Sequence, residues 1–275
     1  MRYLACSDWR FDFKSNLQYR RYTHHLNGKK LKIKKLVVGL ALLTLLISGA
    51  IALTLKPQPP ADPRMLSYTV DLKSQDLQLY WKDDKGEILS SIQNLKTFVE
   101  SKKQTLVFAM NAGMFNPAHW PQGLCIQERK KVTPLDTMAG EGNFYLKPNG
   151  VFYVKTDSTA AVCSTTTFTD DGQIQYATQS GPMLVIEGKI HPAFKKGSPN
   201  LNIRNGVGIL PDGRVLFVMS KTEVNFHDFA AYFQDLGCKN ALYLDGAISR
   251  TYLPEQNWVQ LDGVFGVMVG VTKPK

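Results

Sequence analysis

The sequence has few cysteines and few histidines, and neither kind of residue is spaced as in a metal site. No two of the four cysteines form a Cys-x-x-Cys pair, which argues against a cysteine-based zinc site. His119, His191 and His227 stand far apart in the sequence, and each is typical of a surface or capping group rather than a ligand. We therefore expect neither a metal nor a cofactor.

The common catalytic signatures are also missing. The sequence contains no HExxH, no P-loop, no GxSxG and no GxGxxG before a helix, so it lacks the motifs of zinc proteases, P-loop hydrolases, serine hydrolases and dinucleotide-binding enzymes. Ser180 lacks the glycine two residues upstream that a nucleophile elbow needs. The Ser180-Gly181-Pro182 segment is therefore predicted to be a turn, and Ser180 is not predicted to be a nucleophile.

Acidic residues are fewer than basic ones, 23 against 33, but the excess is confined to one end of the chain. Residues 1–35 carry ten lysines and arginines against two aspartates, so they account for +8 of the formal charge of +10. The remaining residues have a net charge of +2 and offer no basic surface for a phosphate backbone. We expect no nucleic-acid partner.

An uncharged segment of 20 residues follows the basic tail. Residues 36–55 are long enough to cross a bilayer as a helix, and the lysines before them place residues 1–35 in the cytoplasm. A cleaved signal peptide is the competing interpretation, but its apolar region is usually shorter, about 7–15 residues. We expect a single-pass anchor in the inner (plasma) membrane, a proline-rich linker over 56–65, and a periplasmic or extracellular domain over 66–275.

Three cysteines then lie in an oxidising compartment. Cys125, Cys163 and Cys238 can form at most one internal disulfide, because their number is odd. The alternative is that they are buried thiols packed as small apolar groups.

The domain is predicted to be α+β, with a mixed β-sheet and few helices. Short apolar runs separated by turn residues predict strands along most of 66–271, and Pro148-Asn149-Gly150 predicts a hairpin between 143–147 and 151–155. Two segments have helical spacing, one after Ser90 or Ser91 and one from Asn225 to Gly237. The second helix lies between apolar runs at 215–219 and 241–244, as in a β-α-β unit with parallel and possibly adjacent strands.

Two of the predicted strands end in polar loops. Residues 105–110 are followed by Asn111, and residues 241–244 are followed by Asp245. Binding and catalytic groups concentrate on loops that a rigid scaffold holds in place. We expect these two loops to meet in one cleft, with Arg204 beside them.

Five motifs follow one another along the domain: NAGMF at 111–115, GNF at 142–144 with PNG at 148–150, SGPML at 180–184, RNGVG at 204–208 and LDG at 244–246. Their order resembles the phosphodiester glycosidase family, which includes the uncovering enzyme, N-acetylglucosamine-1-phosphodiester alpha-N-acetylglucosaminidase. The resemblance covers about residues 66–271 and is closest to a bacterial envelope branch of the family. Much of the family has Asp-Gly-Gly-Gly-Ser where this chain has Asp245-Gly246-Ala247-Ile248-Ser249.

The resemblance implies a hydrolase that acts on a sugar-phosphodiester, or on another glycosidic bond, in an envelope glycan. A carboxylate can activate water or stabilise an oxocarbenium-like centre, and arginine suits phosphate oxygens. The alternative is a non-catalytic carbohydrate-binding or envelope-assembly module on the same fold. The expected catalytic residues are Asp245 as general base or stabilising carboxylate, Arg204 for phosphate or sugar hydroxyls, and Glu141 as a partner acid. Asn111 is expected to hydrogen-bond the substrate, and Gly113, Ser180 and Gly181 are expected to contact it. Ser249 and Arg250 are second choices for binding the phosphate.

Overall fold

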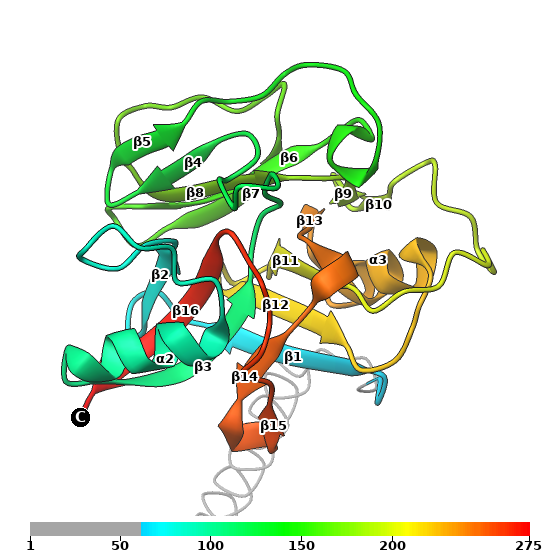
Figure 1. Cartoon of the computed structure of the whole chain (residues 1–275). Helices are drawn as coiled ribbons and strands as arrows, with labels where there is room; N and C mark the ends of the chain where they lie inside the picture. The colour runs from blue at the N-terminus through cyan, green and yellow to red at the C-terminus, as the bar shows by residue number, and fades with distance from the viewer. Residues whose placement is uncertain (1–61) are drawn as a thin grey trace, which may run out of the picture. The chain divides into compact units, whose positions relative to one another are not determined.

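The structure is a computed structural model, and it describes residues 62–275 of the chain. This part consists of three β-sheets, two α-helices and three short 3₁₀ helices (Figure 1). Every strand pair in the three sheets is antiparallel.

The first sheet has six strands and carries the segment that ends at Asp245. In spatial order its strands are β1 (Met65–Val70), β12 (Val215–Ser220), β11 (Asn205–Ile209), β13 (Ala241–Tyr243), β9 (Met183–Ile186) and β10 (Lys189–Ile190). The central strand β11 pairs with β12 on one side and with β13 on the other, with Gly206 opposite Tyr243.

The second sheet has five strands and carries Asn111. Its order is β15 (Trp258–Val259), β14 (Thr251–Leu253), β3 (Gln104–Asn111), β16 (Met268–Pro274) and β2 (Asp76–Tyr80). The third sheet, drawn in green across the top of Figure 1, has the order β5 (Lys130–Thr133), β4 (Cys125–Gln127), β8 (Ile174–Ser180), β6 (Gly150–Lys155) and β7 (Ala160–Ser164).

The main core is shared by all three sheets, because alternate side chains of each sheet point to the same interior. It includes Phe108 of β3, Phe152 of β6 and Phe217 of β12, whose rings pack against one another. A core common to three sheets fixes the sheets relative to one another, and therefore also the loops that leave their strands.

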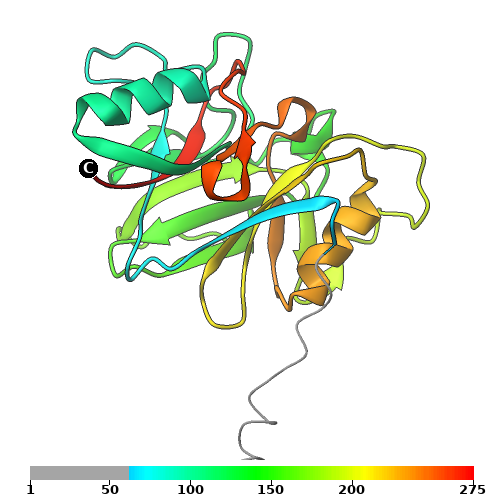
Figure 2. The same ribbon diagram turned by 90° about the horizontal axis from the view of Figure 1, so that it is seen from below.

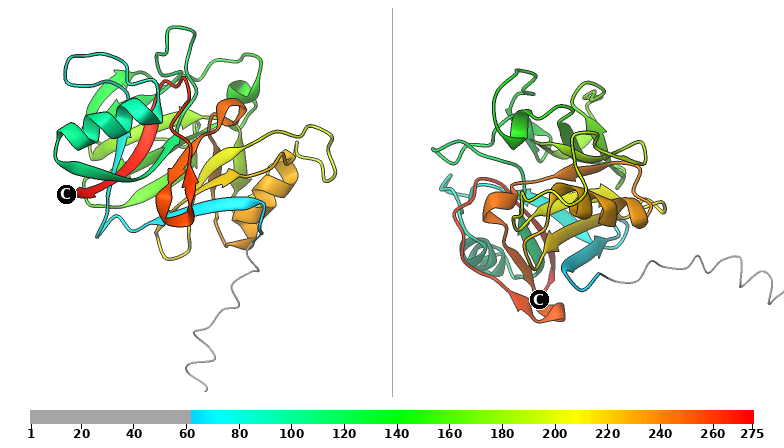
Figure 3. Two further views of the ribbon diagram at one scale, coloured as in Figure 1. Left: turned by 60° about the horizontal axis from the view of Figure 1, so that its bottom comes forward. Right: turned by 90° about the vertical axis from the view of Figure 1, so that its right-hand side faces the viewer.

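Each α-helix covers the outer face of a different sheet, and the two helices lie on opposite sides of the domain (Figures 1 and 2). Helix α2 (Ile92–Ser101) buries Ile92, Leu95 and Val99 and packs on β3, beside β16 (Figure 3). Helix α3 (Phe226–Asp235) buries Phe226, Phe229, Ala230 and Phe233 against the first sheet. Both predicted helices are confirmed.

The side chain of Ser91 caps α2, and that of Asn225 caps α3; each accepts a hydrogen bond from the amide three residues later. Gly237 follows α3 with a φ of 82°, the left-handed conformation that glycine adopts readily. The capping residues therefore set the helix boundaries as the sequence indicated, with Ser91 rather than Ser90 as the first cap.

Two predictions about the sheets were wrong, and a third holds only in part. The sheets are not mixed, since all their ladders are antiparallel within the described residues. Strands β12 and β13 run in the same direction but are not neighbours, because β11 lies between them. Residues 143–147 do not form a hairpin strand: Asn143–Tyr145 is the 3₁₀ helix η1, and Gly150 opens β6, which pairs with β7 and β8.

The predicted tail, anchor and most of the linker lie outside the described residues. Within residues 62–275, no helix has the length and apolar character needed to cross a membrane. The three cysteines of the described domain are free thiols, and Cys125 and Cys238 are buried.

Candidate active site

Asn111 and Asp245 come from different sheets and meet in the structure. Asn111 is the last residue of β3, and Asp245 is the second residue after the end of β13. The side-chain Nδ2 of Asn111 donates a hydrogen bond to the carbonyl oxygen of Asp245 over 2.6 Å, and the amide of Asp245 donates to the carbonyl of Ala112 over 3.0 Å. The two loops that were expected to meet therefore contact each other directly.

The segment 245–250 carries the chain from the first sheet to the second, and Asn111 holds both of its ends. While Nδ2 bonds to Asp245, Oδ1 of Asn111 accepts a hydrogen bond of 3.0 Å from the amide of Arg250. A primary amide suits this position because it both donates and accepts. Between the two ends lies the 3₁₀ helix η2 (Gly246–Ile248), drawn in orange in Figure 1.

Asn205 adds a further connection from the start of β11. Its Nδ2 donates to the carbonyl oxygen of Asn111 over 2.9 Å and to the side-chain Oδ1 of Asn111 over 3.1 Å. Asn111 and Asn205 are 1% and 0% exposed. Both polar atoms of the Asn111 side chain are thus occupied by protein groups, so this residue positions the Asp245 segment rather than presenting a free amide.

The carboxylate of Asp245 is half-buried, and burial raises its pKa to about 6. Removing a carboxylate from water favours its neutral form, and no neighbouring cation of the described domain counters this effect. A carboxyl group with a pKa close to neutrality can accept a proton from water at physiological pH and release it again.

Tyr243 is the last residue of β13 and precedes Asp245 by two residues. Burial raises the pKa of its phenol to about 12; the positive charge of Arg204 opposes this increase, and the negative charge of Asp245 adds to it. A Cβ atom added at Gly246 would lie 2.6 Å from Cε2 of Tyr243 and closer still to its hydroxyl. The phenol therefore lies directly beneath the first turn of the Asp245 segment, and glycine is required there.

Arg204 directly precedes β11, whose Gly206 pairs with Tyr243 at the end of β13. Its side chain is 1% exposed, and its guanidinium carbon lies 3.6 Å from the ring centre of Phe226. Nε donates to the carbonyl of Val224 over 2.8 Å, and one terminal nitrogen donates to the carbonyl of Asn200 over 2.9 Å. Burial lowers the pKa of this guanidinium. The arginine is thus inserted between protein groups, not extended toward solvent.

The glycines expected to assist binding are positions of close packing. A side chain at Gly113 would overlap Thr178 of β8, and one at Gly181 would lie 2.7 Å from the carbonyl oxygen of Phe144. Ser180 is fully buried at the end of β8, and its hydroxyl has no hydrogen-bond partner within the described domain. Gly113 thus lets the loop after Asn111 pack on β8, and Gly181 lets the end of β8 pack on η1.

The remaining expected residues are more peripheral. The hydroxyl of Ser249 donates to the carbonyl of Gly246 over 2.9 Å and closes the turn of η2. Arg250 is half-buried and pairs through Nε with the exposed carboxylate of Asp262 at 2.9 Å. Glu141 is exposed on the loop before η1 and takes part in none of the ion pairs of residues 62–275.

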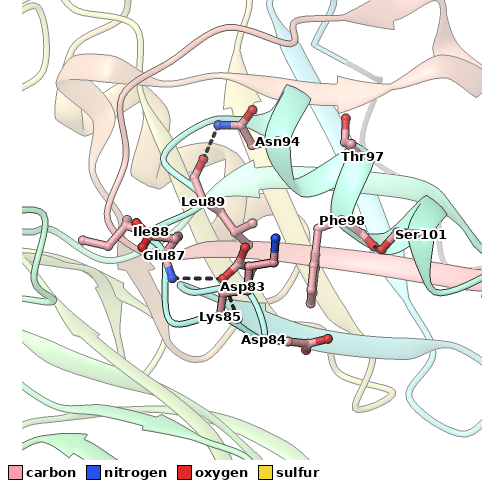
Figure 4. A pocket seen from close by; sticks show the side chains of 10 residues that line it. All are labelled: Asp83, Asp84, Lys85, Glu87, Ile88, Leu89, Asn94, Thr97, Phe98 and Ser101. Atoms are coloured by element: carbon pink, nitrogen blue, oxygen red, sulfur yellow. Dashed lines mark hydrogen bonds between the residues drawn. The ribbon is translucent and has the colours of Figure 1, made fainter.

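A separate cavity of about 420 Å³ lies between the loop 83–89 and α2 (Figure 4). Its acids are occupied locally: one carboxylate oxygen of Asp83 accepts hydrogen bonds from the amides of Lys85 and Glu87, and Asp84 pairs with Lys102. None of the expected site residues lines this cavity. Across residues 62–275, no three His, Cys, Asp or Glu side chains gather in a way that could hold a metal ion.

Two residues of the site were not singled out from the sequence, Asn205 and Tyr243. Tyr243 could have been identified, because it is the one residue with a polar group in the apolar run 241–244. Asn205 lies within the RNGVG motif, but nothing in the sequence indicates that its side chain turns toward Asn111.

Comparison with known proteins identifies the family of this chain. The family model described as phosphodiester glycosidase matches residues 104–265. The uncharacterized protein YigE of Escherichia coli (strain K12) is 35% identical over 226 residues, which are 81% of this chain and 86% of YigE.

Solved structures of low sequence identity share the fold. The zebrafish N-acetylglucosamine-1-phosphodiester alpha-N-acetylglucosaminidase catalytic domain, auto-inhibited by its pro-peptide, is 14% identical, with a TM-score of 0.52 over 78% of this chain and 85% of that chain. A protein of Burkholderia pseudomallei K96243 is 11% identical, with a TM-score of 0.50 over 75% of this chain and 73% of that chain. Because the family model covers all of β3, β11 and β13, and YigE matches most of the chain, the protein belongs to the phosphodiester glycosidase family.

Proposed function

We propose that this protein hydrolyses the bond between a sugar and a phosphodiester, with Asp245 as the general base. The observation that carries the proposal is a half-buried carboxylate whose pKa burial raises to about 6, on a residue whose backbone carbonyl accepts a hydrogen bond from Asn111 at the junction of two sheets. A base with a pKa below neutrality is ionised at pH 7, and a pKa near the operating pH makes proton transfer efficient.

A water oxygen bonds to the anomeric carbon of the sugar, and its proton passes to a carboxylate oxygen of Asp245. The bond between the anomeric carbon and the phosphate oxygen breaks, and its electron pair leaves with the phosphate as a phosphomonoester. Asp245 then returns the proton to solvent.

We assign the cationic contact with the departing phosphate to Arg250 rather than to Arg204. The guanidinium of Arg204 is buried and donates hydrogen bonds to two carbonyl groups, so it supports the packing of Tyr243 and Phe226 from within the domain. Arg250 instead pairs with a carboxylate that is 65% exposed, and such a pair contributes only about 0–1 kcal/mol. A phosphodiester can replace that carboxylate at little cost.

The location of the reaction is part of the same proposal. The uncharged segment 36–55, with lysines before it, is long enough to anchor the domain outside the inner membrane, where envelope glycans are the available substrates. The name of the zebrafish relative supports a sugar linked through phosphate as the substrate class.

The test is the release of a reporter from a synthetic sugar-phosphate diester by the full-length chain. Asp245→Asn keeps the shape of the side chain but removes the base, and we expect turnover to fall by about 10²–10⁴-fold. Asp235→Asn, at an exposed aspartate at the end of α3, is the matched control and should behave like the parent. Parent-like turnover in Asp245→Asn would refute the assignment, and binding without release by the parent would support a non-catalytic carbohydrate-binding module.

A further inference from the structure

A groove of about 430 Å³ lies along β7, the strand at one edge of the third sheet. One wall is formed by residues 160–162 of β7, and the opposite wall by residues 209–211, where β11 ends and turns toward β12. Residues that follow α3, among them Lys239, complete the lining. None of the residues expected at the candidate active site belongs to this groove, so its role is separate from the proposed reaction.

The pairing of β7 with β6 shows which backbone groups of β7 face the groove. At the two ends of this ladder, the amide of Lys155 donates to the carbonyl of Thr159, and the amide of Thr165 donates to the carbonyl of Asn149. Hydrogen-bonded and non-hydrogen-bonded pairs alternate along an antiparallel ladder. The odd-numbered residues of β7 therefore bond to β6, and the N–H and C=O groups of the even-numbered residues point away from it.

Two of these even-numbered residues, Ala160 and Val162, line the groove. Their backbone N–H and C=O groups have no hydrogen-bond partner among residues 62–275, because β7 pairs only with β6 and no turn reaches them. Val162 is nevertheless only 3% exposed. Backbone groups that are shielded from water are almost always paired in folded proteins. The groove thus contains a short row of donors and acceptors that lack partners.

The side chains around this row suit a polypeptide. The walls carry only apolar side chains, those of Ala160, Ala161 and Val162 on one side and of Ile209, Leu210 and Pro211 on the other. Lys239 is the one charged residue of the lining; it is exposed and takes part in none of the ion pairs of the described domain. When an extended peptide is added to a sheet edge, main-chain hydrogen bonds provide affinity and side-chain pockets provide specificity.

The shape of the groove argues against two occupants that the chain itself could supply. The edge of β7 is recessed beside the turn after β11, so the equally recessed edge of a second copy cannot reach it. Residues 56–63 include four prolines, which lack the amide hydrogen that a ladder requires. A single extended segment remains, and an edge strand with unpaired groups is a template for one.

We propose that this groove binds an extended segment of another protein, which adds one strand to β7 and places an acidic side chain beside Lys239. At about 3.3 Å per residue, residues 160–162 span roughly 10 Å, so about three residues of the partner pair with β7. The positive charge of Lys239 favours an acid at the end of that segment.

Binding of peptides to the full-length chain tests the proposal without any turnover. The probe is the tightest binder selected from a phage-displayed library of random peptides, labelled for fluorescence polarisation. Versions of this peptide with N-methyl groups on alternate amides separate the two edges of the added strand. Methylation of the amides that face β7 should abolish binding, whereas methylation of the amides between them should leave it unchanged.

Variants of the chain test the same geometry. Ala160→Pro removes one outward N–H but no hydrogen bond to β6, and proline is tolerated at such edge positions, so the domain should stay folded while binding weakens about tenfold. Lys239→Glu should weaken binding of an acidic peptide by about two- to fivefold or more, and Lys196→Glu, outside the lining, should not.

Four results would overturn the inference. These are that no peptide is selected, that both methylated series bind alike, that folded Ala160→Pro binds like the parent, or that the parent forms a dimer which Ala160→Pro abolishes. The last result would assign the groove to a second copy of the chain. If Ala160→Pro does not fold, the comparison of the methylated peptides on the parent chain still decides.

Discussion

Replacing Asp245 by asparagine should make the folded domain more stable while it removes catalysis. Burial raises the pKa of this carboxyl from 3.8 to about 6, so the folded protein binds a proton more readily than the unfolded chain does. The unfolded state loses its proton first as the pH rises, and unfolding is then favoured. The destabilising contribution of Asp245 is therefore absent below pH 3.8, grows between pH 3.8 and about 6, and is complete above that range.

The size of the effect follows from the shift. A difference of about two pKa units corresponds to at most about 3 kcal/mol. Because the carboxylate is partly open to solvent, the free-energy cost of its burial is smaller than this limit. We therefore expect the free energy of unfolding of Asp245→Asn to exceed that of the parent by about 1–2 kcal/mol at pH 8. Asparagine has the same shape and carries no charge, so it keeps the packing and avoids the desolvation of a carboxylate.

The assay is equilibrium unfolding in urea, with parent, Asp245→Asn and the control Asp235→Asn compared at pH 4 and pH 8. The difference between Asp245→Asn and the parent should be close to zero at pH 4 and favour the variant at pH 8. A variant no more stable than the parent at pH 8, or a gain of equal size at both pH values, would show that burial of this carboxylate is not costly. Loss of activity together with a gain in stability is the pattern expected when a site residue is placed for function.

Two further substitutions test the support of the site. Asn111→Ala removes the hydrogen bonds to Asp245 and Arg250 and leaves their buried backbone groups unpaired. The free energy of unfolding should therefore fall by about 2–4 kcal/mol in urea titrations. A loss below about 0.5 kcal/mol would show that Asn111 does not hold the two ends of the segment 245–250. The lysine of Arg204→Lys cannot form both hydrogen bonds to carbonyl groups and also stack on Phe226, so the free energy of unfolding should fall by about 1–3 kcal/mol. An unchanged free energy of unfolding would mean that the guanidinium geometry is unimportant.

Local sequence signals predicted the helices of this fold well but not the way its strands are arranged. Ser91 and Asn225 cap their helices, because capping depends on residues within one turn. Residues 148–150 do not close a hairpin. The buried side chain of Asn149 bonds back to the carbonyl of Phe144, and this tertiary context outweighs the local preference. The insertion of β11 between β12 and β13 depends on contacts between distant segments, which periodicity does not report.

The candidate site, like the fold, was predictable from the sequence only in part. The meeting of the loops after β3 and β13 followed from polar residues placed at two strand ends. The direction of each side chain did not, since Arg204 is turned by the carbonyls of Val224 and Asn200, which belong to a loop and a helix entry distant from Asp245 in the sequence. Side-chain direction at a site is thus set by partners that only the folded chain brings together.

Gly246 is the one glycine of the segment 245–250 and the most sensitive position of its turn. A methyl group there would overlap the ring and hydroxyl of Tyr243, and this ring cannot move away easily because Phe226 packs against it. Gly246→Ala should therefore destabilise the domain by about 1–3 kcal/mol, as overpacking does, and displace the Asp245 backbone.

The double variant Gly246→Ala with Tyr243→Phe separates this effect from general disruption. Removing the hydroxyl eliminates the nearest overlap but leaves a contact of 2.6 Å with the ring, so part of the lost stability should return. Two residues in contact are expected to show coupling of about 0.5–3 kcal/mol in such a cycle. If the two substitutions were instead additive in urea unfolding, the phenol would not be what holds the turn, and the conformation of the Asp245 segment would depend on Asn111 and the Ser249 hydroxyl alone.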